Sequence, residues 1–310
     1  MKNIIIIDII VINWNSGNKT INALSCYLNE KKDNLVCNII VVDNGSKDNS
    51  LNLLKNKEIT LINNVENIGF GKACNQAFEI CNGDYVLLLN PDTESSLMVL
   101  EKLVAIMENN SGYAIIGPQQ KNEHGEIIRT CGRFPSFISS VFELTSLSKL
   151  FPTVFLPTPI MKEWNHSESR DVDHIMGSYL LIKRSVLKEI GGMDDRFFVY
   201  FEDLDVSKRV INKGYKIHYT TSCNIIHEGG GSGEKEKEKR LLYSINSRRI
   251  YWKKYFGTIN YFILVLLSLT IELPLRVINT LFKEKRVAFF STTHIYISSL
   301  KSLIKKEEEI

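Results

Sequence analysis

The stretch Tyr85-Val86-Leu87-Leu88-Leu89-Asn90-Pro91-Asp92 is an apolar run that stops abruptly at polar residues. A continuous apolar run of this length is typical of a strand that is buried on both faces of a parallel sheet. Pro91 restricts the backbone around it, so that the side chains of Asn90 and Asp92 can point toward one locus. The stretch therefore predicts a central strand with a polar site at its carboxyl end.

Apolar runs alternate with amphipathic stretches throughout the part of the chain that precedes this strand. We expect strands over residues 4–12, 38–42 and 59–62, and helices over 19–29, 49–56 and 72–80. This order predicts an α/β fold in which helices cover both faces of a mostly parallel sheet. Ligands of such sheets bind at the carboxyl ends of the strands, so the residues after each strand are candidate site residues.

Regular elements continue after the central strand. We expect helices over 96–109 and 185–190, and strands over 114–116, 174–182 and 224–226. Residues 131–170 lack periodicity and contain several prolines and aromatic residues, which is typical of a substrate-facing excursion. The glycine-rich run 229–233 precedes alternating Glu and Lys residues and predicts a hinge. We therefore place a domain boundary there, between residues 1–232 and a C-terminal helical extension over 233–310.

The composition narrows the class of protein. The chain has 310 residues and is 44% hydrophobic, which is enough to bury one large core or a core with an appendage. A formal net charge of +3 gives no reason to expect nucleic acid as a partner. The six cysteines form no Cys-x-x-Cys pair, so neither a zinc site nor a disulfide framework is predicted. The scattered cysteines therefore fit a reduced cytoplasmic setting, which includes the inner face of the cell membrane, and Asp8 interrupts the first apolar run, which argues against a signal peptide.

Residues 261–273 are strongly apolar, but Glu272 and Pro274 end this segment short of the roughly 20 residues that a membrane-spanning helix needs. Basic residues flank the segment on both sides: Lys253, Lys254, Arg276, Lys283, Lys285 and Arg286. This pattern is typical of a helix that lies on a membrane surface, and it predicts peripheral membrane contact through residues 253–286. A core helix that packs on the main domain explains the same segment equally well.

Three acids, Glu202, Asp203 and Asp205, follow the aromatic segment 197–201. Burial and mutual repulsion in such surroundings raise a carboxyl pKa toward the range that suits a general base. The same acids also suit the first turn of a helix, where they meet the positive end of the helix dipole. Acidic residues at the ends of two upstream strands favour the catalytic interpretation.

Two stretches could contact a nucleotide. Asp43 ends the second expected strand and precedes a turn at Gly45, so its carboxylate could accept hydrogen bonds from a ribose hydroxyl or simply cap that turn. Gly69 and Lys72 stand where another turn opens a helix. Backbone N–H groups, the helix dipole and the lysine could cradle a diphosphate there, although such glycines also occur in ordinary loops.

A divalent cation could bind at the end of the central strand. Asn90 and Asp92 offer oxygen ligands, which Mg²⁺ and Mn²⁺ prefer. His227, at the end of the strand 224–226, could add a nitrogen ligand if it lies near Asp92. The alternatives are a turn residue that caps the following helix and a histidine that only packs.

Taken in order, these motifs resemble those of the family 2 glycosyltransferases, which have the GT-A fold, and more closely the bacterial rhamnosyltransferase-like members. The resemblance runs from about residue 6 to residue 232. The stretches that carry it are 41–46, 67–75, 89–92, 177–194, 200–205 and 227–230. One departure is Asn90, which replaces the first acid of the family's Asp-x-Asp motif and leaves Asp92 as its only carboxylate.

The resemblance implies a role for each candidate residue. Asp203, with Glu202 beside it, would be the catalytic base. The nucleotide and its sugar would contact Asn15, Asp43, Asn67, Gly69, Lys72, Asn90 and Asp92. Asp92 and His227 would hold Mg²⁺ or Mn²⁺, and Gly177 and Ser178 would face the acceptor.

The implied function is the inverting transfer of a sugar from a nucleotide diphosphate to a saccharide or lipid-linked saccharide of a bacterial surface polysaccharide. Rhamnose from dTDP-rhamnose is the best match, and a UDP- or GDP-sugar is the alternative. A nucleotidyltransferase would need a Gly-rich, basic loop after the first strand, where this chain has Asn13-Trp14-Asn15-Ser16-Gly17. A non-catalytic protein that binds sugar nucleotides would fit Asn90 but not the intact Glu202-Asp203 pair.

Overall fold

The computed structural model describes residues 4–30, 32–55, 57–156, 160–229, 237–282, 295–297 and 299. The chain divides into two compact units. The sheet unit comprises residues 1–134, 160–198 and 202–232, and the helical unit comprises 135–159, 199–201 and 233–310. Each unit has its own hydrophobic core of buried side chains.

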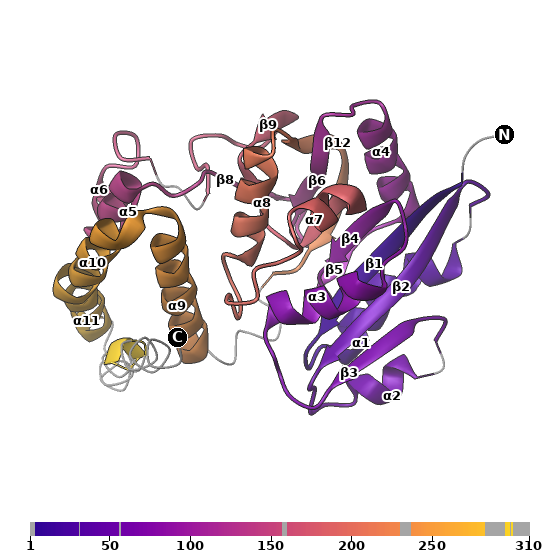
Figure 1. Ribbon diagram of the computed structural model, residues 1–310, viewed down its shortest axis with the longest axis horizontal. Coiled ribbons are helices and arrows are strands. Elements are labelled where there is room, and N and C mark those ends of the chain that lie inside the picture. The colour runs from indigo at the N-terminus through magenta and orange to yellow at the C-terminus, as the bar shows by residue number, and fades with distance from the viewer. Residues whose placement is uncertain are drawn as a thin grey trace. The chain divides into compact units, whose positions relative to one another are not determined.

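The sheet unit is built on one mixed sheet with the strand order β3-β2-β1-β4-β11-β6-β12-β5 (Figure 1). Its strands are β1 Ile5–Asn13, β2 Leu35–Asn44, β3 Thr60–Asn64, β4 Tyr85–Leu89, β5 Thr93–Glu94, β6 Tyr113–Lys121, β11 Tyr179–Lys183 and β12 Lys216–His227. Two short strands, β7 Ile127–Ile128 and β9 Arg170–Val172, pair with β6 and β12. The first four strands are mutually parallel, and β11 inserts antiparallel between β4 and β6. The predicted mostly parallel sheet is therefore confirmed.

Strand register brings the polar strand ends to one edge of the sheet. Asn13 at the end of β1 lies opposite Asp43 at the end of β2, and β4 runs parallel to β1. Because β11 is antiparallel to β4, its first residue, Tyr179, lies opposite Leu89, the last residue of β4. The strands β6 and β12 run in the same direction as β4, so β12 brings His227 to this edge as well. We call it the carboxyl edge.

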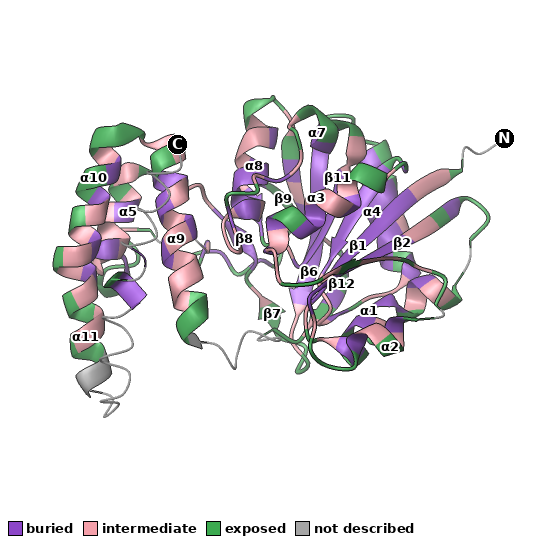
Figure 2. Ribbon diagram, turned by 60° about the horizontal axis from the view of Figure 1, so that its bottom comes forward, coloured by how far each residue is buried: buried purple, intermediate pink, exposed green. Residues whose placement is uncertain are grey.

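Alternate side chains of the strands enter two cores, one on each face of the sheet. Ile9 and Val11 of β1 belong to one core, and Ile10 belongs to the other. The helices α1 Gly17–Asn29 and α4 Leu97–Glu108 contribute to the first core, and α3 Phe70–Ile80, α7 Arg184–Glu189 and α8 Glu202–Asn212 contribute to the second. A further short helix is α2 Ser50–Leu54. Figure 2 shows the buried strands between helices whose outer faces are exposed.

Three predicted elements differ from the structure. The single strand expected over 174–182 is divided into β10 His174–Ile175, which pairs with β8 Cys131–Gly132 in a separate sheet, and β11. The expected strand is interrupted at Gly177. The N–H of this residue donates to the Asp203 carboxylate and not to a neighbouring strand. The strand expected over 224–226 begins earlier, at Lys216, and shifts of register within it obscure its periodicity in the sequence. The stretch expected to be irregular over 131–170 contains two helices, α5 Phe137–Leu144 and α6 Leu147–Leu150.

The helical unit contains α5, α6, α9 Lys237–Tyr255, α10 Gly257–Leu267, the π-helical turn η2 Ser268–Glu272 and α11 Leu273–Phe282. The last three form one continuous helix, so the expectation that Glu272 and Pro274 end the apolar segment is wrong. Pro274 is tolerated because it follows the π-helical turn, where the regular ladder of backbone hydrogen bonds is already interrupted. Lys283, Lys285, Arg286 and the hinge expected from Gly230 to Gly233 lie outside the described residues.

The helix continues through Glu272 because two arginines of the helical unit neutralise the charge of this residue. Arg248 of α9 binds it at 2.5 and 3.0 Å, and Arg276 binds it at 3.0 Å. Burial alone would raise the pKa of this carboxyl, but the two guanidinium groups outweigh it and lower the pKa to about 2. The helix Gly257–Asn279 is long and apolar enough to cross a membrane. Core helices of soluble proteins can meet the same two criteria.

Candidate active site

The loops after β1 and β2 are joined through Asp43, which is fully buried. Asn13 donates to its Oδ1 at 2.6 Å, and the Ser46 backbone N–H donates to its Oδ2 at 3.0 Å. Thr20 of α1 donates to the Asn13 carboxamide oxygen at 2.6 Å. Asp43 thus holds together the two loops that follow β1 and β2. Its contact with a nucleotide stays a prediction.

Asn15 lies on the exposed side of the same loops. Its φ of 52° is left-handed, a conformation that asparagine tolerates better than most residues. Its carboxamide oxygen accepts the Lys47 N–H at 2.7 Å, and its own N–H donates to Ser46 Oγ at 2.9 Å. Ser46 thus links Asn15 to Asp43, and the contact of Asn15 with a nucleotide stays a prediction.

Uncharged carboxamides hold the loop between β3 and α3. The Asn44 side chain, which is buried at the end of β2, donates to Asn67 Oδ1 at 3.0 Å. Asn44 Oδ1 accepts from the Asn64 side chain and from the Ile68 N–H, both at 3.1 Å. Asn67 in turn accepts the Gly69 N–H at 2.9 Å. We call Asn44, Asn64, Asn67 and Gln76 the carboxamide cluster, since Asn64 also bonds Gln76.

Gly69 permits the N-terminus of α3 to approach the segment before α8. It has a φ of 93°, and a Cβ atom there would lie 2.6 Å from the Phe198 carbonyl oxygen. The Phe70 N–H donates to that same oxygen at 2.6 Å. Lys72 follows in the first turn of α3 and is exposed. Its side chain is therefore free of the core and available to a ligand at this end of α3.

The segments that carry Asp92 and Asp203 meet at Gly177 and Ser178. The Asn90 N–H donates to the Ser178 carbonyl oxygen at 2.9 Å, and the Gly177 N–H donates to Asp203 Oδ2 at 2.9 Å. The Asp203 carboxylate at the start of α8 and the turn after β4 are thus both bound to the dipeptide that precedes β11. The two segments that carry the predicted metal ligand and the predicted base are therefore joined through this dipeptide.

Ser178 itself faces inward. It is 4% exposed, and its Oγ lies 2.6 Å from Nε2 of the fully buried Gln120. Gly177 has no side chain, and a Cβ atom there would lie 3.3 Å from the Asp203 carboxylate. The two residues therefore support Asp203 and the turn at Asn90, and their contact with an acceptor stays a prediction.

Asp92 and His227 form a pair at the carboxyl edge. His227 Nε2 lies 3.3 Å from Asp92 Oδ1, and both side chains are largely buried. Burial would raise the pKa of Asp92, but the hydrogen bond and charge of His227 outweigh this and lower it. The backbones also meet here, since the Glu228 N–H donates to the Asp92 carbonyl oxygen at 3.1 Å.

This pair can supply two ligands to a hard cation. Among the residues that the structure describes, no group of three or more His, Cys, Asp or Glu side chains is placed to hold an ion. The remaining ligands would therefore come from water and a diphosphate, which is how Mg²⁺ and Mn²⁺ usually bind in phosphate-transferring and nucleotide-binding sites. The donor set fits such an ion.

Lys19 was missed by the sequence analysis. It lies in α1 and forms an ion pair with Glu228, the residue after His227. The hydrogen bond to Glu228 raises the pKa of Lys19, and the charge of Asp92 acts in the same direction. A cation therefore stands beside the Asp92–His227 pair, and only the fold reveals it, because 209 residues separate Lys19 from Glu228.

Glu202 and Asp203 begin α8, but their environments differ. Glu202 is 6% exposed and its Oε2 is buried with no hydrogen-bond partner. Burial, and secondarily the charge of Asp203, raises the pKa of Glu202 well above its usual range. Asp203 is 22% exposed and so can meet a substrate. Of the two expected catalytic acids, Asp203 has the accessible carboxylate, and a catalytic role for either stays a prediction.

His174 was also missed. It is buried in β10, with Nε2 3.8 Å from Asp203 Oδ2 and Nδ1 3.0 Å from Ser207 Oγ. Burial lowers the pKa of His174, and the charges of Asp203 and Asp173 oppose this only in part. In the sequence His174 looks like the first residue of an ordinary strand.

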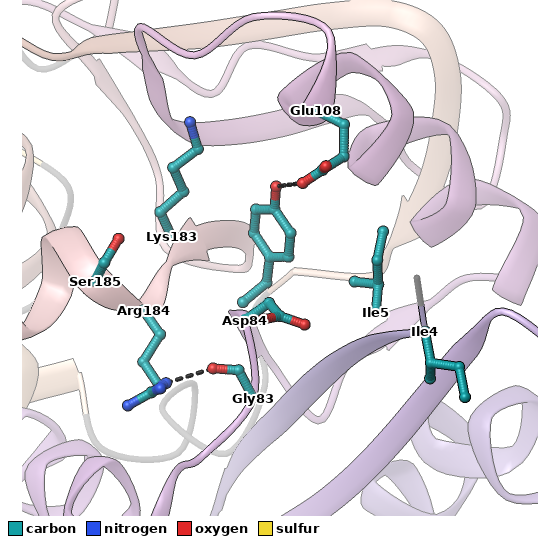
Figure 3. Close-up of a pocket in the computed structure, with 9 residues that line it drawn as sticks. Ile4, Ile5, Gly83, Asp84, Glu108, Lys183, Arg184 and Ser185 are labelled. Atoms are coloured by element: carbon teal, nitrogen blue, oxygen red, sulfur yellow. Dashed lines mark hydrogen bonds between the residues drawn. The ribbon is translucent and has the colours of Figure 1, made fainter. Parts of the chain in front are cut away.

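A hollow of about 540 Å³ lies at the opposite edge of the sheet, among the first residues of β1 and β4 (Figure 3). Its two cations are already engaged by backbone oxygens, Arg184 by Gly83 and Lys183 by Ser111. None of the predicted site residues lines this hollow. The residues predicted from the sequence to act in catalysis and binding therefore lie outside this hollow.

Comparison with known proteins identifies the family to which the chain belongs. The family model described as Glycosyl transferase family 2 matches residues 8–191. An N-acetylglucosaminyl-diphospho-decaprenol L-rhamnosyltransferase of Mycobacterium tuberculosis is 24% identical over 226 residues, which cover 69% of this chain and 73% of that protein. The rhamnosyltransferase WbbL of Escherichia coli K12 is 27% identical over 156 residues, or 49% of this chain and 55% of that one.

The fold is shared with solved glycosyltransferases. A mannosyltransferase from Pyrobaculum calidifontis, in complex with GDP-Man and Mn²⁺, superposes with a TM-score of 0.53 at 14% identity and covers 97% of this chain and 87% of that one. The fold is thus GT-A, as the resemblance implied.

Proposed function

The chain belongs to glycosyl transferase family 2 and is a glycosyltransferase, and from that premise we propose that it transfers a sugar from a nucleotide diphosphate to a hydroxyl group with inversion at the anomeric carbon. The observation that carries the proposal is the junction at Gly177 and Ser178. There Asp203 accepts the Gly177 N–H, and Asn90, two residues before Asp92, donates its N–H to the Ser178 carbonyl oxygen. A base and a diphosphate site would then face the same sugar.

In this proposal each group has one task. Asp203 accepts the proton of the acceptor hydroxyl as that oxygen attacks the anomeric carbon, which is general-base catalysis. Attack on the face opposite the leaving diphosphate inverts the anomeric centre. Asp43, Asn15 and the carboxamide cluster shape the pocket for the nucleoside. Lys19 and Lys72 supply positive charge to the diphosphate.

Asp92 and His227 would hold Mg²⁺ or Mn²⁺, and solved structures of the same fold contain Mn²⁺. A divalent ion held by these two residues would stabilise the negative charge that develops on the leaving diphosphate. With Asn90 in place of an acid, the protein contributes only one carboxylate from the Asn90-Pro91-Asp92 turn, so binding of the ion should depend on the nucleotide.

The best candidate for the donor is dTDP-rhamnose, since two of the similar proteins are rhamnosyltransferases. A thermal-shift screen of the purified protein with Mn²⁺ and dTDP-, UDP- or GDP-sugars tests this choice. We expect the largest rise in melting temperature with the dTDP compounds. A larger rise with UDP or GDP compounds would assign the donor to that nucleoside instead.

The proposed acceptor is a saccharide carried on a lipid diphosphate at the cytoplasmic face of a membrane. One similar protein is named for such an acceptor. In the helical unit, the helix Gly257–Asn279 exposes an apolar stripe made of Ile259, Phe262, Ile263, Leu266, Leu275 and Ile278. Lys253 is exposed just before it, as expected for a helix that rests on anionic headgroups.

Vesicle sedimentation tests this contact. The full chain should bind vesicles of phosphatidylglycerol, and Phe262→Asp with Leu266→Asp should release it. Met98→Asp, which changes an exposed apolar residue of α4, is the matched control and should bind as the wild type does. Equal binding by all three proteins would count against the stripe.

A further inference from the structure

The buried imidazole of His174 lies between two side chains of α8 that are one turn apart. Its Nε2 lies 3.8 Å from Asp203 Oδ2, and its Nδ1 lies 3.0 Å from Ser207 Oγ. The histidine side chain is 7% exposed, whereas that of Asp203 is 22% exposed. His174 therefore contacts the base from behind, on the side away from solvent.

The hydrogen bonds fix which imidazole nitrogen carries the proton. Ser207 Oγ donates its one hydrogen to the Asp203 backbone oxygen at 2.8 Å. It must therefore accept from His174, which places the imidazole hydrogen on Nδ1 and leaves a lone pair on Nε2. That lone pair faces Asp203 Oδ2. A separation of 3.8 Å is longer than a hydrogen bond and is what two acceptors with no proton between them should show.

The surroundings of His174 oppose its protonation, and the charge of Asp203 acts against that effect. Burial lowers the pKa of His174, while the negative charges of Asp203 and Asp173 act in the opposite direction. Asp173 is engaged elsewhere, since the Phe134 N–H donates to it at 3.4 Å. Asp203 is thus the acid that faces the free nitrogen of His174.

We propose that His174 shares the proton that Asp203 removes from the acceptor, and so acts as a positioning residue that strengthens this base. The proposal rests on the function proposed above. In the transfer step the acceptor O–H bond breaks and its oxygen bonds to the anomeric carbon. The electron pair of the broken sugar–oxygen bond leaves on the diphosphate. The proton goes to Asp203, and once it lies on Oδ2 it can be donated in a hydrogen bond to Nε2 of His174, the nitrogen that faces this oxygen.

When two such groups interact, the affinity for the shared proton is a property of the pair and cannot be assigned to either residue alone. The active form has an ionised Asp203 and a neutral His174, and a proton on either member removes it. Since two basic groups bind the proton more tightly than one, the acid side of the pH profile of kcat should reflect the pair. Removal of the imidazole should weaken proton binding, lower the plateau rate and move the acid side of the profile to lower pH.

Two substitutions separate this role from a structural one. His174→Asn retains an N–H group for Ser207 but places nothing opposite Asp203. His174→Gln places an amide opposite Asp203 but gives up the bond to Ser207. Neither amide can accept a proton. Sugar transfer by the full chain would be followed from pH 5 to 9, with dTDP-rhamnose as donor and an N-acetylglucosaminyl-diphospho-lipid as acceptor.

We expect both variants to lose about tenfold or more in kcat, a part of the factor of 10² to 10⁴ that a general base supplies. We also expect the acid side of both profiles to move down by about one pH unit, with little change in KM. If either variant keeps the wild-type rate, or if the rate falls but the profile stays in place, the proton-sharing role is wrong. Full activity of Asp203→Asn would instead overturn the proposed function itself.

A measurement on the wild-type protein needs no variant. The nitrogen chemical shifts of the His174 imidazole at neutral pH should report a hydrogen on Nδ1 and a bare Nε2, and titration should show a pKa below that of an exposed histidine. An imidazole with its hydrogen on Nε2 would contradict the proposal even if the variants were inactive.

Discussion

The candidate site contains two aspartate–histidine pairs that look alike in composition and differ in setting. Asp92 and His227 lie 3.3 Å apart at the ends of two strands, and Lys19 contributes a positive charge beside them. Asp203 and His174 lie 3.8 Å apart, with the histidine nearly enclosed. In the first pair, positive charge from Lys19 and His227 already offsets the charge of Asp92. In the second pair, the Nε2 atom of His174, which carries no hydrogen, faces the Asp203 carboxylate.

This difference teaches that the surroundings, and not the residue types, assign the chemistry. A carboxylate with a lowered pKa stays ionised and suits a cation, which is the case for Asp92. A carboxylate backed by a neutral imidazole is suited to gain a proton and lose it again. In the proposed mechanism one residue pair therefore balances charge and the other transfers a proton, and each can be disturbed separately.

Asp203→Asn should have the largest effect on the proton-transfer pair. We expect kcat to fall by a factor of about 10² to 10⁴ because the general base is lost, while nucleotide binding is spared. Steady-state transfer and a nucleotide-binding isotherm measure the two quantities. Glu202→Gln, one residue away and equally isosteric, is the control and should retain most of the activity. A fully active Asp203→Asn enzyme would exclude this residue as the base.

Asp92→Ala should disable the other pair and leave the first intact. The response of the rate to added Mn²⁺ should disappear, with a loss of about 100-fold or more, since a metal contributes several kcal/mol to charge stabilisation. Glu94→Ala changes an exposed acid two residues away and should respond to Mn²⁺ normally. Equal rates of the wild type in EDTA and in Mn²⁺ would show that the ion has been misassigned.

Gly177→Ala should shift the base without removing it. The new methyl group would lie 3.3 Å from Asp203 Oδ2, a contact that requires the carboxylate to move by a few tenths of an ångström. We expect kcat to fall about tenfold because reacting groups tolerate little displacement. Gly112→Ala, which meets open space, is the control. If the two alanine variants have the same kcat, the contact between Gly177 and Asp203 does not affect catalysis.

Glu202→Gln should change stability and not chemistry. The pKa of Glu202 is raised in the folded protein, so between the unfolded and folded pKa values the native state binds more protons than the unfolded state. The wild type should therefore lose stability as the pH rises through this range, by about 1.4 kcal/mol for each pH unit that separates the two pKa values. The Gln variant should lack that slope in denaturant unfolding from pH 4 to 8, and an identical slope would mean that Glu202 is already ionised.

Much of the fold follows from the sequence because its strands are short, continuous and apolar. The strands β1 to β4 and the residues at their ends were all expected in the correct order. The break at Gly177 was not expected, because the hydrogen bond that causes it comes from Asp203, 26 residues away in the chain. The continuation of the apolar helix past Glu272 depends likewise on Arg248, a partner in another helix.

The site could be predicted only in part for the same reason. Asp43, Asp92 and Asp203 follow strands or open a helix, so their positions have a local signal. Asn13, Lys19 and His174 have none, since each acquires its role from a residue distant in the chain. The one sequence signal for His174 is that it lies three residues before Gly177, which supports Asp203. This spacing can be interpreted only when the position of α8 is known.

The carboxamide cluster has a consequence for how the protein behaves across conditions. Asn44, Asn64, Asn67 and Gln76 bind one another without any ionisable group. Neither acid nor salt can therefore loosen the loop that they hold, in contrast to the histidine pairs nearby. As the pH falls, this part of the nucleoside pocket should therefore keep its shape while the charge of the two aspartate–histidine pairs changes.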